Sequence, residues 1–132
     1  FLVAATPEAG LYKNGSALGS DQVLGDAGTS IFNNAIPFSI GAQNINLTPE
    51  KFFDGLVDEV RVWNDRRTQQ ELQDNDMLEL IGNEANFQAY FKLNGNYLDE
   101  TSNNNDLTSS GSPAFVSDVP FDNLGRSYGF FM

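Results

Sequence analysis

The sequence predicts an all-β protein, an antiparallel β-sandwich with one short helix. Residues 56–63 place β-branched and aromatic side chains in alternation on two faces, which is the periodicity of a strand. Several further short strands are expected, each bounded by Gly, Asn, Asp or Pro turn signals. This spacing favours a sandwich over alternating β and α units.

Composition sets limits on the fold and on its partners. The chain has 132 residues, enough for one domain, and 40% of them are apolar, including eleven Phe, which supports a real core. The formal net charge is −11 and the basic residues form no cluster, so nucleic acid and anionic membranes are poor partners. No run of about eighteen apolar residues exists, so membrane insertion is not expected. The absence of Cys excludes disulfides and thiolate metal sites.

The N-terminal part of the chain is expected to consist of strands joined by polar loops. Asn14-Gly15 marks a hairpin, because both residues tolerate the positive φ of a two-residue turn. Pro37 has no N–H and indicates a strand start or an edge strand. The expected elements are a strand at 1–5, a hairpin at 11–18, a loop at 21–34, a strand at 36–42 and a loop at 43–49.

The expected strand at 52–63 contains an unusual carboxylate. By parity, Asp58 lies on the same face as Leu56, Val60 and Val62 and therefore faces the interior. A buried ionised carboxylate is costly unless it is paired, hydrogen-bonded or bound to a metal. We therefore expect a cation or a hydrogen-bond donor beside Asp58.

A helix is expected directly after this strand. Thr68 stands three residues before Glu71, which is the spacing of a capping box. The helix is predicted to run from about residue 69 to residue 80 and to end near Gly82, which suits the position after a helix C-terminus.

The remaining part of the chain returns to short strands and turns. Asn94-Gly95 is a second two-residue turn signal. The expected elements are a strand at 88–93, a polar loop at 99–106, and short strands at 114–116 and 127–131 separated by a turn region at 120–125.

Four segments together resemble a known family. Residues 53–64 read F-x-G-x-V-D-E-V-R-V-W-N and are followed by the expected short helix. Residues 11–15 (LYKNG), 40–42 (IGA) and 90–107 (YFKLNGNYLDETSNNNDL) add to this pattern. The chain resembles the laminin-G-like, concanavalin-A-like jelly rolls of extracellular bacterial and animal proteins. The resemblance implies that the sandwich has jelly-roll topology.

The order of these segments differs from that of the family. Residues 1–82 resemble the closing half of a laminin-G-like sandwich, whereas residues 88–132 resemble the opening half of the same or the next repeat. The chain reads as the end of one domain joined to the start of the next, or as a permuted, shortened domain. We interpret it as a piece of a tandem array or a processed product. Strands of the two halves are expected to lie in register in one shared sandwich or in adjacent ones.

Catalysis is not expected. The chain has no His and no Cys, so most nucleophile–base arrangements are absent. A carboxylate pair could serve a glycosidase, but the neighbours Asp58 and Glu59 point to opposite faces of a strand. We therefore predict that the protein is not an enzyme.

Calcium is the better chemical hypothesis. The loop at 99–106 is dense in the carboxylate and amide oxygens that calcium prefers, and the resemblance adds support because such domains often bind one calcium at a rim. The alternative is a turn in which Asn and Asp side chains hydrogen-bond to their own backbone. The candidate metal ligands are Asp58, Asp99, Asn103 and Asp106.

Aromatic residues near turns suggest a carbohydrate site, because aromatic rings stack on sugar faces while Asn and Asp bind the hydroxyls. Most of the eleven Phe and Trp63 are expected in the core instead. The candidate ligand platforms are Tyr12, Tyr97 and Tyr128, together with Phe32. Asn14 (Asn-Gly-Ser) and Asn46 (Asn-Leu-Thr) stand in glycosylation sequons.

These features predict a non-enzymatic adhesion or carbohydrate-binding module, one unit of a tandem array. Such a module would be secreted or displayed on the cell surface and would bind a glycan or a surface protein. The alternative is a structural subunit that assembles into a homo-oligomer, fibre or sheath. If central strands of the sandwich are missing, its edges are open and a neighbouring copy could supply strands.

Overall fold

The computed structural model describes residues 12–18, 37–45, 47–116 and the backbone of 129–131. The elements predicted at 1–5, 21–34 and 120–125 lie outside these residues. The described chain is mostly strands with one short helix, as predicted, and it contains no helix long and apolar enough to cross a membrane. The elements are β1 (Tyr12–Lys13), β2 (Ser16–Ala17), β3 (Gln43–Ile45), β4 (Thr48–Glu50), β5 (Leu56–Val57), β6 (Val60–Trp63), α1 (Gln69–Asn75), β7 (Phe87–Phe91), β8 (Ala114–Val116) and β9 (Gly129–Phe131).

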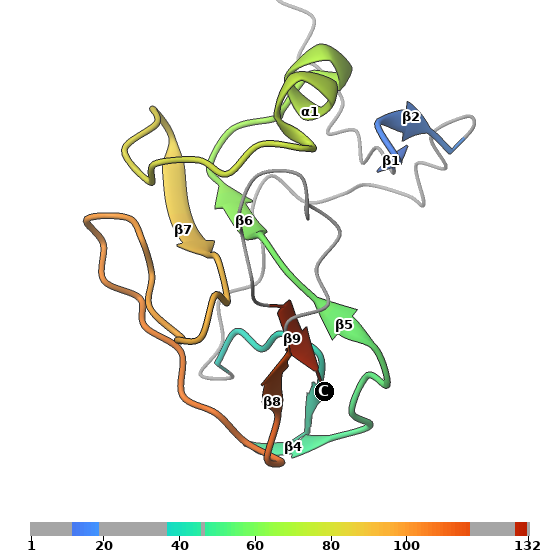
Figure 1. Cartoon of the computed structure of the whole chain (residues 1–132), viewed down its shortest axis with the longest axis vertical. Coiled ribbons are helices and arrows are strands. Elements are labelled where there is room, and N and C mark those ends of the chain that lie inside the picture. Colours follow the sequence, from blue (N-terminus) through green and yellow to red (C-terminus); the bar gives the residue numbers. More distant parts are fainter. Residues whose placement is uncertain (1–11, 19–36, 46, 117–128, 132) are drawn as a thin grey trace, which may run out of the picture.

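An antiparallel ladder between β6 and β7 forms the centre of the described structure (Figure 1). Arg61 lies opposite Tyr90 and Val62 lies opposite Ala89, with an irregularity between Val62 and Trp63. A separate three-stranded sheet has the order β5-β9-β8. Both sheets join strands from the first part of the chain to strands from the second part, so the two parts pair within one chain. The division into closing and opening halves stays a prediction.

The predicted continuous strand is broken between β5 and β6. Glu59 adopts a φ of 53°, in the left-handed region that side-chain-bearing residues rarely occupy. The break directs β5 to β9 and β6 to β7. It also ends the regular alternation of faces, because Leu56 is 42% exposed whereas Val57 packs on the core with Val60. The placement of Leu56 on the buried face was therefore wrong, whereas Asp58 is half-buried and its Oδ1 is shielded from solvent.

The predicted capping box begins the helix. The Thr68 hydroxyl accepts a hydrogen bond from the Glu71 N–H at 3.2 Å, and the Glu71 carboxylate accepts one from the Thr68 N–H at 2.8 Å. The helix ends at Asn75, earlier than predicted. Arg61 explains the early end, because its guanidinium donates to the carbonyls of Asn75 and Leu78, which a continuing helix would use itself.

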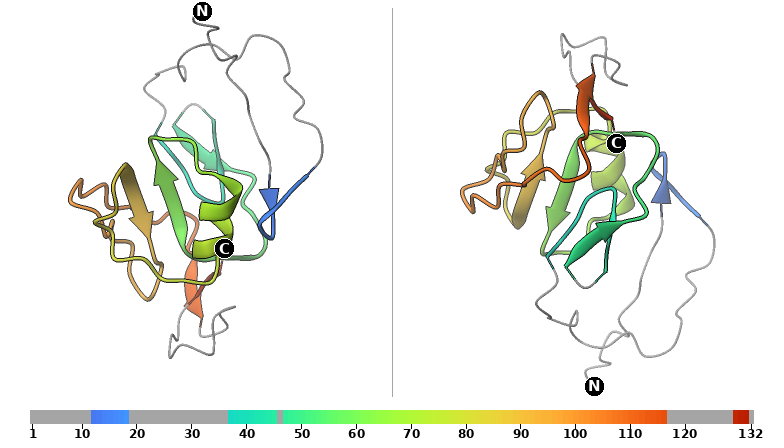
Figure 2. Two further views of the ribbon diagram at one scale, coloured as in Figure 1. Left: turned by 90° about the horizontal axis from the view of Figure 1, so that it is seen from above. Right: turned by 90° about the horizontal axis from the view of Figure 1, so that it is seen from below.

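The described chain also contains two β-hairpins, β1–β2 and β3–β4, which form separate two-stranded sheets. The β1–β2 hairpin forms around Asn14-Gly15 as predicted and lies beside α1 (Figures 1 and 2). The side chains of Gln69 and Gln73 on α1 both donate to the Gly15 carbonyl. The residues expected to form a loop at 43–49 instead form the β3–β4 hairpin, with Leu47 at a φ of 67° in its turn. The strand predicted at 36–42 was wrong, because residues 37–42 form no strand.

Strand β7 is buried on both faces and supports two small core clusters. On one face, Ala89, Phe91 and Leu93 pack with apolar residues that include Val60 and Val62. On the other face, Phe87 and Tyr90 pack with Leu80, and the ring of Trp63 stacks on Phe87 at 4.0 Å between centroids. Gln88 is exposed, whereas the other four residues of β7 are buried, which explains why the sequence of this strand is mostly apolar.

Candidate functional site

A hollow of about 330 Å³ lies between the segment at 37–44 and the loop at 106–113. A second hollow of about 480 Å³ shares Phe38, Asp106 and Leu107 with the first and reaches Val62 and Phe91 on the β6–β7 ladder. We refer to the two together as the groove. Their size falls within the range of small-ligand sites, about 300–1,000 Å³.

Aromatic rings line much of the groove. Phe38 contributes to both hollows and is 64% exposed, and Phe52 lines the first hollow and is 50% exposed. Tyr97 lines the same hollow and is half-buried, because its ring rests against Phe115 at 4.9 Å between centroids. The groove thus combines exposed rings with one ring fixed by packing.

Short-range hydrogen bonds position these rings. The Ser39 hydroxyl donates to the Ala42 carbonyl at 2.9 Å, and the Phe53 N–H donates to the Gly41 carbonyl at 2.8 Å. The first bond closes a turn within the segment at 37–42, and the second ties this segment to the residues before β5. On the opposite wall the Leu107 N–H donates to the Tyr97 carbonyl at 2.9 Å, which closes the loop behind the ring.

Asn44 adds an unsatisfied polar atom to the groove. The residue lies on β3 and lines the first hollow, and its Oδ1 is buried without a hydrogen-bond partner in the structure. Most buried polar side-chain atoms in proteins are hydrogen-bonded, so an exception deserves an explanation. Protein atoms enclose this oxygen, so a ligand hydroxyl in the groove would reach it only after the amide turns toward the hollow.

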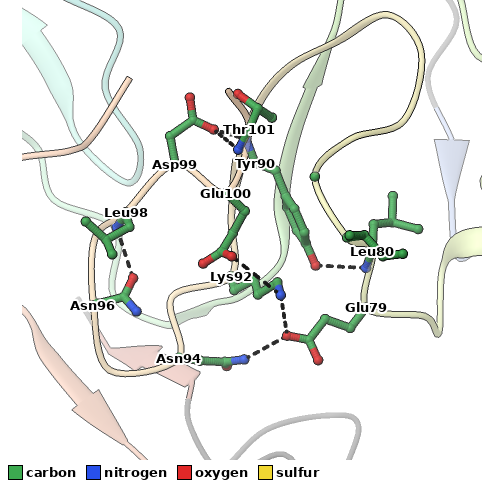
Figure 3. Close-up of polar contacts among 12 residues, drawn as sticks. Glu79, Leu80, Tyr90, Lys92, Asn94, Asn96, Leu98, Asp99, Glu100 and Thr101 are labelled. Atoms are coloured by element: carbon green, nitrogen blue, oxygen red, sulfur yellow. Dashed lines mark hydrogen bonds and ion pairs between the residues drawn. The ribbon is translucent and has the colours of Figure 1, made fainter. Parts of the chain in front are cut away.

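The loop at 99–106 is organised by Asp99, whose carboxylate is buried (Figure 3). Its Oδ1 accepts hydrogen bonds from the N–H groups of Tyr90 and Thr101, both at 3.0 Å, and its Oδ2 accepts one from Asn105 at 2.8 Å. Burial by itself raises the pKa of Asp99. The N–H groups of Thr101, Tyr90 and Asn105 stabilise the charged form by more, so the pKa lies below its ordinary value.

The same loop covers the outer edge of β7. Asn103 and Asn105 donate side-chain amides to the Gln88 carbonyl at 2.9 and 3.1 Å, and the Glu100 N–H donates to the Tyr90 carbonyl at 2.9 Å. An uncovered strand edge is a template for aggregation. The polar loop therefore supplies hydrogen bonds to this edge of β7 that a neighbouring strand would otherwise supply.

This geometry bears on the proposed calcium ligands. The Asp99 carboxylate accepts hydrogen bonds from backbone N–H groups, and the Asn103 amide donates to the Gln88 carbonyl. Asp106 lines the groove, and its carboxylate accepts from the Asp99 N–H at 2.9 Å. Asp58 lies apart from this loop, between β5 and β6, and has its own polar interaction. Among the described residues, no group of three or more carboxylates is arranged to hold a metal ion. The arrangement fits a turn that bonds to its own backbone better than it fits a cation, and calcium binding stays a prediction.

The other predicted site residues are dispersed. Tyr97 lies in the groove, whereas Tyr12 is half-buried on β1, in the hairpin beside α1. Asn14 is exposed in the β1–β2 turn, where it would be accessible to modification. Tyr128, Phe32 and Asn46 lie outside the described residues.

The D-E-V-R motif serves a structural purpose in the described chain. Glu59 accepts a hydrogen bond from Arg61 at 2.7 Å and one from the Tyr90 hydroxyl at 2.5 Å, and the Leu80 N–H donates to the same hydroxyl at 3.1 Å. Burial and the Glu59 carboxylate raise the pKa of Tyr90, so the phenol stays protonated. This network ties the residues after α1 to the β6–β7 ladder.

Sequence reasoning missed the groove residues Phe38, Asn44 and Phe52. Asn44 stood in a segment predicted as a loop, and neither Phe differs from its neighbours in sequence context. The groove arises where residues near 40 meet residues near 107, a contact that no local pattern records. Only a charged or aromatic motif at regular spacing could have indicated the groove from the sequence. Residues 37–44 and 106–113 contain no such motif.

Comparison with known families gives one match. The family described as the Concanavalin A-like lectin/glucanases superfamily, in its laminin-G-like group, matches residues 2–73, more than half of the chain. The chain belongs to this superfamily. Laminin-G-like domains of the superfamily are generally non-catalytic, carbohydrate-binding or adhesion domains and are typically extracellular. No curated protein and no solved structure gives a match.

Proposed function

We propose that this laminin-G-like domain is a non-enzymatic extracellular module that binds a carbohydrate in the groove. The aromatic lining of the groove carries the proposal, because Phe38 and Phe52 are 64% and 50% exposed and the Asn44 side chain lies in the same hollow. A sugar supplies both complements, apolar faces for Phe38 and Tyr97 and hydroxyl donors for Asn44.

The carboxylate of Asp106 extends this recognition. Asp106 lines both hollows and uses its Oδ1 to accept from the Asp99 N–H, which fixes the side chain at the groove wall. A fixed acceptor loses little conformational freedom when it binds a hydroxyl. The module would then be secreted or displayed at the cell surface, with a glycan or a glycosylated surface protein as its partner.

A glycan array tests the proposal directly. We expect saturable binding by the unmodified chain, and at least a tenfold weaker Kd for the Asn44→Ala and Phe38→Ala variants. Ile81→Ala is the matched control, because Ile81 is also an exposed apolar residue but lies outside the groove. Absence of any glycan hit, or hits that both groove variants retain, would contradict the proposal.

Self-assembly into a fibre or sheath is the second candidate. Among the described strands, β6 pairs only with β7, and several apolar side chains around β4 and β5 are exposed. A strand from a second copy could cover both features. Light scattering over a concentration series checks this candidate: growth in particle mass favours assembly, and a monomer at high concentration removes it. The exposed residues are Leu47, Phe52, Phe53 and Leu56.

A further inference from the structure

The loop between α1 and β7, residues 76–86, presents apolar side chains to solvent. Met77 is 56% exposed, Leu78 is 48% exposed and Ile81 is 74% exposed. Leu80, in the same loop, points into the core beside Tyr90. The loop thus divides its apolar residues between the core and the surface, and the exposed ones fall within five residues of sequence.

Hydrogen bonds fix the backbone of this loop, and Figure 3 shows the one between Leu80 and Tyr90. The Leu80 N–H donates to the Tyr90 hydroxyl, and the N–H groups of Ile81 and Gly82 both donate to the Glu84 carboxylate at 2.9 Å. Gly82 is buried at a φ of 95°, and a Cβ there would lie 2.3 Å from a backbone oxygen of the loop at 99–106. A larger residue at this position would therefore push the loop away.

Acidic residues lie next to the exposed apolar residues in the sequence. Residues 76–86 contain Asp76, Glu79 and Glu84 and no basic residue. Burial raises the pKa of Glu84, but hydrogen bonds from Ile81 and neighbouring N–H groups lower it by more, so the carboxylate is ionised at neutral pH. Two cations contact this part of the chain. Lys92 is ion-paired with Glu79 at 3.2 Å and with Glu100 at 3.6 Å (Figure 3), and the Arg61 guanidinium donates to the Leu78 carbonyl.

We propose that the α1–β7 loop is a docking surface for a protein partner that offers an apolar pocket rimmed by Lys or Arg. Because the backbone of this loop is already fixed, it loses little conformational entropy when a partner buries its apolar side chains, which suits an interface. The acidic residues Asp76, Glu79 and Glu84, which we call the acidic rim, favour a partner with positive charge. This surface is separate from the groove and goes beyond carbohydrate binding.

Charge argues against other occupants. A second copy of the chain also carries a net charge of −11 and would bring a second acidic rim against the first. An anionic membrane would be repelled for the same reason. A basic, apolar protein surface is the occupant that complements both the side chains and the charge.

A peptide titration tests this proposal on the intact chain. The probe is an amphipathic peptide of Leu and Lys, compared with a peptide of the same length made of Gly and Lys. We expect the Leu/Lys peptide to shift the amide resonances of residues 76–86. Its Kd should rise about tenfold in the Met77→Ser/Ile81→Ser variant, whereas the Gly/Lys peptide should bind both proteins equally weakly.

The control is Leu47→Ser/Leu98→Ser, which removes two Leu that are 65% and 51% exposed and lie elsewhere on the surface. Its Kd for the Leu/Lys peptide should stay within twofold of the unmodified chain. Equal loss in both double variants, or shifts confined to residues outside 76–86, would overturn the proposal. A dimer or anionic-vesicle binding that the Met77→Ser/Ile81→Ser variant abolishes would also overturn it, because the occupant would then be a second copy or a membrane.

Discussion

The two faces of β7 hold regions that use their polar groups differently. On the Tyr90 face, ionised groups are paired inside the chain, as in the contact of Glu59 with Arg61 and Tyr90. On the Phe91 face, the groove leaves Asn44 Oδ1 without a partner and leaves Phe38 largely exposed. One face therefore stabilises the fold, whereas the other, in our proposal, keeps stacking and hydrogen-bonding groups for a ligand.

The largest effect should come from breaking the network on the Tyr90 face. Arg61→Ala leaves the Glu59 carboxylate, whose side chain is only 7% exposed, without its ion-pair partner. It also removes the donor that ends α1. We expect the free energy of unfolding to fall by about 3 kcal/mol in urea denaturation.

Arg67→Ala is the control for that prediction. Arg67 pairs with Asp65 and Glu71, whose side chains are 34% and 41% exposed, so we expect a loss of about 1 kcal/mol or less. Similar losses of unfolding free energy in both variants would show that the network on the Tyr90 face stabilises the fold no more than exposed ion pairs do.

Asp99 should have the next largest effect. Asp99→Ala removes the acceptor of three backbone N–H groups and should cost about 2 kcal/mol. The pKa of Asp99 is lowered from an ordinary value of 3.8, so its contribution is present above about pH 4 and is lost as the pH falls through the lower pKa of the folded state.

Urea midpoints between pH 2 and pH 6 check the Asp99 prediction. The unmodified chain should lose more stability than Asp99→Ala as the pH falls below about 4. Asp54→Ala, at an exposed position, serves as the control. Parallel curves for the unmodified chain and Asp99→Ala would contradict the assigned role of the carboxylate.

A groove variant should behave in the opposite way. Asn44→Ala removes a buried acceptor that has no partner, so we expect stability to stay the same or to rise by up to about 1 kcal/mol. Glycan binding should be lost in the same variant, which is the trade between stability and function expected at a binding site. A clear loss of stability would show that Asn44 belongs to the fold and not to the site.

Calcium should have the smallest effect on this account. A ligand that binds only the folded state raises the melting temperature by mass action. Because the Asp99 oxygens already accept backbone hydrogen bonds, we expect no shift on titrating calcium into chelator-treated protein up to millimolar concentration. A rise that Asp106→Asn abolishes would establish the calcium site that the sequence suggests.

Local signals in the sequence identified the parts of the fold that local chemistry decides. The capping box of Thr68 and Glu71 and the hairpin at Asn14-Gly15 were confirmed because a few adjacent residues determine each of them. The break at Glu59 was not predictable by alternation, since the Glu59 carboxylate is bound by Tyr90, a residue far away in the sequence, as well as by the nearby Arg61.

The candidate site was only partly predictable. Tyr97 was identified as an aromatic near a turn, and Asp106 as an oxygen ligand in a polar loop, and both line the groove. Asn44 and Phe38 could not be identified, because their role depends on a contact between segments far apart in the chain. The two β-strands of the 43–50 hairpin were missed for a related reason, since their turn at Leu47 lacks the usual Gly.

Amide chemical-shift mapping with the strongest glycan from the array tests the central claim most directly. The account predicts saturable shifts at residues 38–44, 97 and 106–110, around the groove, and none in the loop at 76–86. Shifts that avoid the groove, or binding that Asn44→Ala leaves unchanged, would contradict the assignment of the groove as the ligand site.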